Sequence, residues 1–101
     1  AEMFFKGREY FEAAWHYCES GFLFILLGKL NEASILAKKA SLACDKGRID
    51  VILNELSYVC ELLSKKAIYE AEEHWKRLRM KFKESYANLI DLCFASVRRK
   101  T

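Results

Sequence analysis

Hydrophobic residues recur every three or four positions along most of the chain, which is the spacing of amphipathic α-helices. In the first segment they fall at positions 4, 11, 15, 18, 22 and 25 and predict a helix from about Met3 to Leu27. Gly28 follows directly and suits a left-handed C-terminal cap. Glycine weakens a helix, so either Gly7 or Gly21 is expected to mark a break or the close approach of another backbone.

Two further helices are predicted by the same spacing. The second begins at Asn31, a favoured N-cap residue, and carries Glu32 in its first turn, where an acidic side chain complements the helix dipole. It ends near Lys46 and Gly47, a cation and a glycine that suit a C-terminus. The third covers about residues 50 to 63, where apolar residues again recur at helical spacing.

The last 54 residues, from Arg48 to Thr101, contain no glycine or proline. One helix of that length would measure about 80 Å, too long for a small compact domain. A break is predicted at residues 64 to 66, between a basic helix end and an acidic helix start. The final helix then runs from about Ile68 to Val97 and is about 45 Å long. Residues 1–101 are therefore predicted to form a single all-α domain, a four-helix antiparallel array with a long C-terminal helix.

Residues 14 to 45 carry small and aromatic side chains at positions that suit a closely packed, antiparallel pair of helices. Two helices approach closely only where the side chains between them are small. The helix-pair packing is assigned to Tyr17, Gly21, Phe24, Gly28, Ala33, Ala37 and Ala40. This pattern predicts packing and carries no chemistry of its own.

The same stretch resembles one tetratricopeptide (TPR) repeat. Gly21 and Phe24 fall at the first-helix glycine and aromatic of that repeat, Gly28 falls at its turn, and the three alanines fall at its small second-helix positions. The chain departs from the motif at Ser20 and Asp45, and residues 48 to 101 do not repeat it. The resemblance implies a scaffold that binds peptides or partner proteins in a concave groove. A solenoid usually needs about three repeats, so the long final helix is expected to complete this single unit.

A second resemblance is to the HEPN domain, a helical bundle of toxin and antiviral systems. Its ribonuclease members carry an arginine four to six residues ahead of a histidine on a late helix. Here Arg8 precedes His16 on the first helix, with seven residues between them. The resemblance therefore implies a non-catalytic HEPN-like regulator.

Composition supports a core without a bound cofactor, because 52% of the residues are hydrophobic and 14% are aromatic. The cysteines lie 26, 16 and 33 positions apart, with no Cys-x-x-Cys pair, at Cys18, Cys44, Cys60 and Cys93. This spacing favours buried thiols, one on each of four helices, over a metal site. No metal and no cofactor is predicted.

The longest apolar run, Phe22 to Leu27, has six residues, against about 20 for a membrane-spanning helix. Charged residues interrupt the first apolar residues, unlike the continuous apolar region of a signal peptide. No membrane span is predicted, and the expected location is cytoplasmic.

Catalytic patterns are absent from the sequence. His16 and His74 lie 58 residues apart, and neither has a serine or cysteine at the spacing of an assisted nucleophile. There is no phosphate loop, dinucleotide fingerprint or His-Glu-x-x-His motif. The chain is predicted not to be an enzyme, with His16 at the surface or the boundary of the core and His74 solvated on a helix.

Positive charge is concentrated at the C-terminus. Residues 76 to 101 have a net charge of +6, whereas the whole chain has +3. The basic residues are Lys76, Arg77, Arg79, Lys81, Lys83, Arg98, Arg99 and Lys100. They form either a contact surface for nucleic acid or an acidic partner, or a solvated helix face with a cationic tail, which is the interpretation we favour.

The pattern as a whole predicts an interaction or scaffold module without catalytic activity, which binds a protein partner or copies of itself. The long final helix is expected to extend beyond its neighbours and to form a homodimer through Tyr86, Leu89, Cys93 and Phe94. The alternative is a nucleic-acid-binding accessory protein that uses the basic residues of the last helix.

Overall fold

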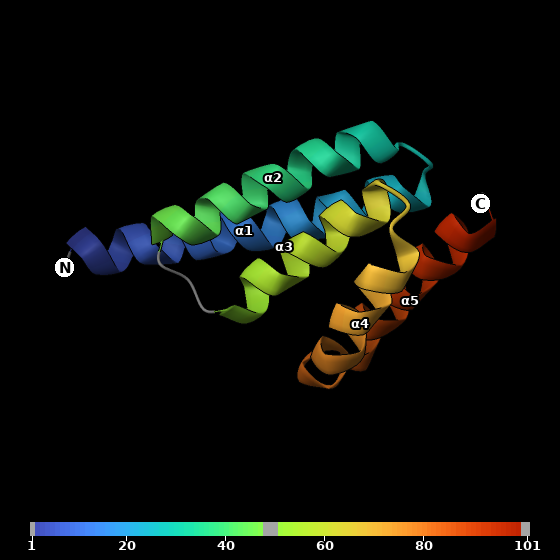
Figure 1. Cartoon of the computed structure of the whole chain (residues 1–101). Helices are drawn as coiled ribbons and strands as arrows, with labels where there is room; N and C mark the ends of the chain where they lie inside the picture. Colours follow the sequence, from blue (N-terminus) through green and yellow to red (C-terminus); the bar gives the residue numbers. More distant parts are fainter. Residues whose placement is uncertain (1, 48–50, 100–101) are drawn as a thin grey trace.

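The structure, a computed structural model, describes residues 2–47 and 51–99. These residues form α1 (Glu2–Leu26), α2 (Leu30–Gly47), α3 (Val51–Ser64), α4 (Ile68–Leu78), the 3₁₀ turn η1 (Arg79–Lys81) and α5 (Glu84–Arg99), and no strand. Figure 1 shows α1 and α2 side by side with α3 along them, while α4 and α5 form a second pair that crosses this layer steeply. The predicted all-α class is confirmed.

The first three helices agree with the predicted segments to within a few residues. The start of α2 differs, because the helix begins at Leu30 and the carbonyl of Lys29 accepts the N–H of Ala33 at 3.1 Å. Asn31 is therefore inside the helix, and its prediction as the N-cap is wrong. Glu32 does lie in the first turn of α2 and Lys46 in its last.

The turn between α1 and α2 is a Schellman motif, in which two backbone bonds close the helix end. Lys29 N–H donates to the carbonyl of Phe24 at 2.9 Å, and Gly28 N–H donates to that of Ile25 at 3.0 Å. Gly28 has a φ of 80°, in the left-handed region. The predicted left-handed cap at Gly28 is confirmed.

The turn between α3 and α4 has the same hydrogen bonds. Ala67 N–H donates to the carbonyl of Leu62 at 2.9 Å, and Lys66 N–H donates to that of Leu63 at 3.0 Å. Lys66, with a φ of 65°, occupies the left-handed position that Gly28 holds in the first turn. The break predicted at residues 64 to 66 is confirmed.

The single helix predicted over residues 68 to 97 is wrong, because the chain folds back after Leu78. Phe82 is extended, with φ −112° and ψ 156°, and α5 then returns antiparallel to α4. Folding back lets both helices bury an apolar face, which one straight rod could not do in so small a domain. The buried residues are Ala71, Trp75 and Leu78 on α4, and Ala87, Ile90, Cys93, Phe94 and Val97 on α5.

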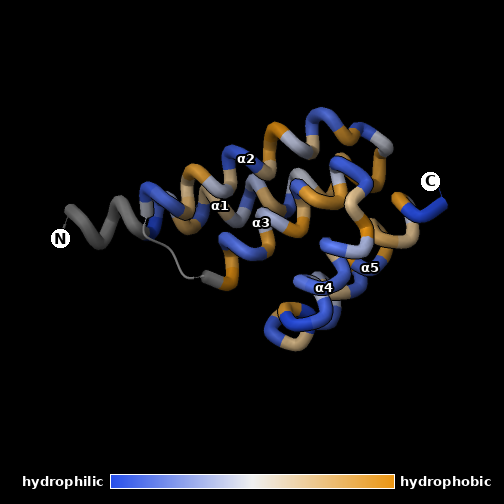
Figure 2. The backbone as a smooth tube through the Cα atoms, viewed as in Figure 1, coloured by the Kyte–Doolittle hydropathy of each residue, from blue (hydrophilic) through white to orange (hydrophobic). Residues whose placement is uncertain are grey.

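The last helix packs against the first and closes the core. The Cys93 thiol donates to the carbonyl of Phe22 at 3.2 Å. The ring of Trp15 stacks on Phe82 at 6.1 Å and meets Tyr86 edge-on at 4.9 Å. The C-terminal segment therefore covers the first hairpin, as expected, but does so through α5. Hydrophobic and hydrophilic stretches alternate along the described helices in Figure 2, as they do where each helix buries one face.

All four cysteines are buried and unpaired, one on each of α1, α2, α3 and α5, as the spacing predicted. Burial raises the pKa of the Cys18 and Cys93 thiols to about 12, and it also raises that of Cys60. The thiols are therefore protonated at neutral pH and pack as small apolar side chains.

Candidate interaction groove

The residues assigned to helix-pair packing lie mainly between α1 and α2. Ala33, Ala37 and Ala40 are fully buried, and Tyr17 and Phe24 are half-buried against them, whereas Gly28 lies in the exposed turn. These positions therefore serve mainly to pack the first hairpin.

Gly21 is a position at which neighbouring helices come very close to α1. A Cβ added there would lie 2.7 Å from the Cys60 sulfur and 3.7 Å from the Ala33 carbonyl oxygen. The helix is continuous at Gly21, so the close approach predicted for a glycine comes from α3 and α2 without a break in α1.

The basic residues do not form one continuous face. The guanidinium of Arg79 pairs with Asp91 at 2.8 Å, that of Arg77 lies 3.5 Å from Glu55, and Arg98 pairs with Glu72. The turn back after α4 also separates two groups to opposite ends of the hairpin (Figure 1). One end holds Arg79, Lys81 and Lys83, and the other holds Arg98 and Arg99; Lys100 lies outside the described residues.

The predicted homodimer contact is contradicted for two of its four residues. Cys93 and Phe94 are buried in the core of the protein itself, at 0% and 4% exposure. Tyr86 and Leu89 are half-buried and line a small apolar cavity with Trp15. The overhang was expected from one long helix, and it disappears because that helix is folded in two.

Asp91 joins α4, η1 and α5. Its carboxylate accepts the indole N–H of Trp75 at 2.8 Å and the guanidinium of Arg79 at 2.8 Å. Burial by itself raises the pKa of Asp91, but the hydrogen bonds from Arg79 and Trp75 outweigh it and hold this pKa below its ordinary value. Asp91 thus provides a hydrogen-bond acceptor for the N–H of a buried indole, which is a structural role.

An open groove of about 470 Å³ lies where α2, α3 and α4 meet. This volume is within the range of about 300–1,000 Å³ that is common for binding sites. Its lining comes from all three helices and consists of Ser41, Asn54, Glu55, Ser57, Tyr58, Glu61 and His74. The lining combines charged, aromatic and hydrogen-bonding side chains.

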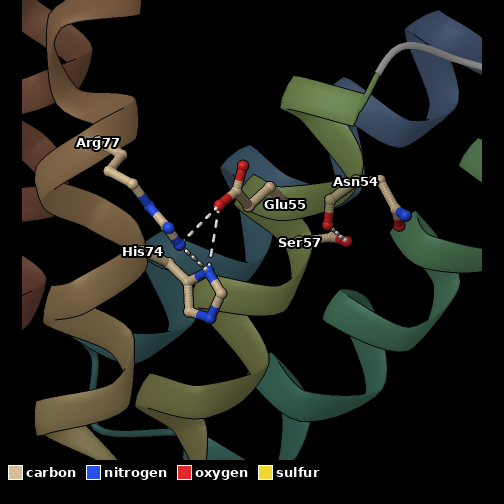
Figure 3. Close-up of polar contacts among 5 residues, drawn as sticks. All are labelled: Asn54, Glu55, Ser57, His74 and Arg77. Atoms are coloured by element: carbon tan, nitrogen blue, oxygen red, sulfur yellow. Dashed lines mark hydrogen bonds and ion pairs between the residues drawn. The ribbon is translucent and has the colours of Figure 1, made fainter.

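Glu55, His74 and Arg77 meet at one edge of this groove, as Figure 3 shows. The Glu55 carboxylate lies 3.1 Å from His74 Nδ1 and 3.5 Å from Arg77 Nη2. His74 Nδ1 and Arg77 Nη2 are 3.1 Å apart. Tyr58 meets the His74 ring edge-on at 5.1 Å. His74 is therefore half-buried and bonded, and its prediction as a solvated residue is wrong.

The bonds at His74 decide which of its nitrogens carries the proton. Nδ1 cannot donate to Glu55 and accept from Arg77 at the same time. We assign the proton of the neutral ring to Nδ1, because a carboxylate is the stronger acceptor. Nε2 then carries a free lone pair, and in Figure 3 this nitrogen points away from both partners.

No pattern in the sequence identified the groove. Glu55 and Tyr58 are three residues apart, as are His74 and Arg77, so each pair shares a helix face. Which faces meet is set by the turn at Lys66, which fixes α4 against α3. The sequence signal was therefore two separate polar faces, with nothing to show that they pack together.

The Arg8 and His16 pair lies on the surface of α1. Arg8 is 3.5 Å from Glu12, one turn along the helix, and both side chains are exposed. His16 is also exposed. Among the residues described, no group of three or more His, Cys, Asp or Glu side chains could hold a metal ion. None of the described helices is both long enough and apolar enough to cross a membrane.

Comparison with known proteins gives no relative from which a role could be carried over. No family model matches the chain, and neither the curated proteins nor the solved structures contain a match.

Proposed function

We propose that this protein is a non-catalytic interaction module that binds a segment of a partner protein in the groove between α2, α3 and α4. The observation that carries the proposal is the lining of the groove. Tyr58 is 44% exposed and stands among carboxylate, amide and imidazole groups. An accessible tyrosine surrounded by hydrogen-bonding groups is typical of protein interfaces and of their energetic centres.

The walls of the groove are held in place before any partner arrives. The Ser57 hydroxyl donates to the Asn54 carbonyl at 2.6 Å, and Ser41 on α2 bonds to the Asn54 side chain at 3.4 Å. Glu55 joins α3 to α4 through His74. Because less side-chain freedom is lost on binding, a pre-organised groove binds more tightly than a mobile one. The TPR resemblance of residues 14 to 45 implies the same class of role.

The hydrogen bonds in the groove do not support catalysis. A serine nucleophile needs a base within hydrogen-bond reach. The Ser57 hydroxyl instead donates a hydrogen bond to a backbone carbonyl, and the Ser41 hydroxyl donates one to the Asn54 side chain. His74 Nδ1 faces Glu55, and no described hydrogen bond joins the ring to a serine or cysteine.

Nucleic-acid binding receives less support from the arrangement of charge. Of the predicted contact residues that the structure describes, three arginines already pair with carboxylates, and the rest are divided between the two ends of the α4–α5 hairpin. Binding through Lys76, Lys81 and Lys83 would weaken steeply with salt. A gel-shift titration at increasing ionic strength with DNA and RNA measures this alternative directly.

Self-association also stays a prediction, but Cys93 and Phe94 are no part of an exposed contact. Sedimentation equilibrium over a range of protein concentrations measures it. A single-species monomer at high micromolar concentration would contradict it.

A matched pair of tyrosines tests the groove. A photo-crosslinking amino acid at Tyr58 should capture a partner from an extract of the native host, whereas the same label at Tyr69 should not, because Tyr69 lies outside the groove lining and is 87% exposed. Tyr58→Ala should then abolish co-purification of that partner, and Tyr69→Ala should leave it intact. Equal capture at the two positions would contradict the proposal.

A further inference from the structure

The groove between α2, α3 and α4 is lined by two carboxylates and an exposed tyrosine. We propose that it recognises a positively charged side chain, lysine or arginine, on the bound segment. This inference rests on the proposed function and names the class of ligand that the groove takes.

The charges that line the groove are all negative. Among its lining residues Glu55 and Glu61 are carboxylates, while no lysine or arginine takes part. Both glutamates lie on α3, six residues apart with Tyr58 midway between them. An incoming cation therefore meets a carboxylate on either side of the aromatic ring.

The cations that now balance these glutamates lie outside the lining. Lys65 pairs with Glu61 at 3.1 Å with its side chain 59% exposed, and Arg77 lies 3.5 Å from Glu55 with its side chain 68% exposed. Exposed pairs of this kind contribute little free energy, so a bound cation can share or replace them.

The other groups favour a donor over an acceptor. The face of an exposed tyrosine attracts ammonium and guanidinium groups through its ring quadrupole. With the proton on Nδ1, His74 offers Nε2 as an acceptor. The side-chain oxygen of Asn54 accepts a hydrogen bond from Ser41, so the wall of the groove between α2 and α3 is polar. A lysine or arginine has only N–H donors and matches this set, whereas an acidic side chain would meet two like charges.

The test uses four blocked pentapeptides that differ only in the central residue: lysine, arginine, glutamine or glutamate between glycines. Each is titrated into the full chain, labelled with ¹⁵N, and amide chemical shifts are followed. The lysine and arginine peptides should shift the signals of groove residues such as Asn54, Tyr58 and Glu61. The glutamine and glutamate peptides should not.

Two charge-neutralising variants locate the effect. Glu61→Gln should weaken binding of the lysine peptide about three- to fivefold, the size expected when one partly exposed ion pair is lost. Glu73→Gln removes the same charge from an exposed position on α4 that does not line the groove, and should leave binding unchanged.

Three results would overturn the inference: equal loss in both variants, stronger binding of the glutamine or glutamate peptide, or no shift at the groove with any peptide. The photo-crosslink at Tyr58 does not depend on the ligand's charge. It therefore separates failure of this inference from failure of the proposed function.

Discussion

The hairpins α1–α2 and α3–α4 have the same type of turn but carry buried side chains of different size at matching positions. When the two hairpins are aligned at their Schellman turns, Gly28 corresponds to Lys66, 38 residues later. Ala33 then corresponds to Ala71, and both alanines are fully buried. In the same alignment, Ala37 corresponds to Trp75. The same turn geometry thus precedes a helix with a buried alanine at this position in one hairpin and a helix with a buried tryptophan in the other.

The two interfaces have different consequences for the rest of the molecule. Alanines at Ala33, Ala37 and Ala40 bring α2 against α1 along most of its length, and this pair has the most extensive contact between helices in the described residues. Trp75 reaches beyond its own hairpin, because its indole N–H bonds to Asp91 on α5 and its ring lies 6.1 Å from that of Phe82. The first hairpin is therefore closely packed, and α5 is joined to both hairpins, to α1 through Cys93 and Phe22 and to α4 through Asp91 and Trp75.

The largest effect is expected where the second hairpin has its large residue. Trp75→Ala should lower the free energy of unfolding by about 3–5 kcal/mol, because it leaves a cavity and removes the bond to Asp91. Urea denaturation followed by circular dichroism measures the loss. Tyr69→Ala, at an exposed position of the same helix, should change stability by less than about 0.5 kcal/mol. A similar small change in both variants would mean that Trp75 does not support α5.

The first hairpin should be sensitive to the opposite change. Ala37→Leu adds volume at a fully buried position of α2, and overpacking of this kind costs about 1–3 kcal/mol. Lys38→Leu makes the same residue at an exposed position of α2 and serves as the control. Thermal melts of the two variants compare them directly. Unchanged melting of Ala37→Leu would show that this interface can widen to accept a larger side chain.

Asp91 offers a smaller, pH-dependent test of the link from the second hairpin to α5. Its pKa is lower in the folded protein than in the unfolded chain, so the carboxylate stabilises the fold above its unfolded pKa, which is about 3.9. That contribution is lost as the pH falls through the lower, folded pKa. Wild type should exceed Asp91→Asn in stability near neutral pH, and the difference should shrink below about pH 4. Denaturation curves from pH 7 to pH 2 measure it, and a constant difference would contradict the assignment.

The two hairpins also explain what the sequence could predict. The first was readable because small residues and Gly28 mark both its interface and its turn. The fold-back after Leu78 was missed because neither glycine nor proline marks it, and because residues 75, 78, 82, 86, 89 and 93 keep a spacing of three or four across it. The groove was missed for another reason. Its residues come from three helices, and their meeting depends on packing between segments distant in sequence.

The smallest effect is expected at the left-handed position of the turn, which is Gly28 in the first hairpin and Lys66 in the second. Lys66 has a φ of 65°, which costs a side-chain-bearing residue about 1–2 kcal/mol, whereas Gly28 adopts a similar angle freely. Lys66→Gly removes that strain but adds freedom to the unfolded chain, so the net gain should be about 0.5 kcal/mol. Lys65→Gly loses the same side chain one residue earlier and should instead destabilise the protein. Precise denaturant midpoints distinguish the two signs. A loss of stability in both variants would mean that the left-handed position of the second turn carries no strain for glycine to relieve.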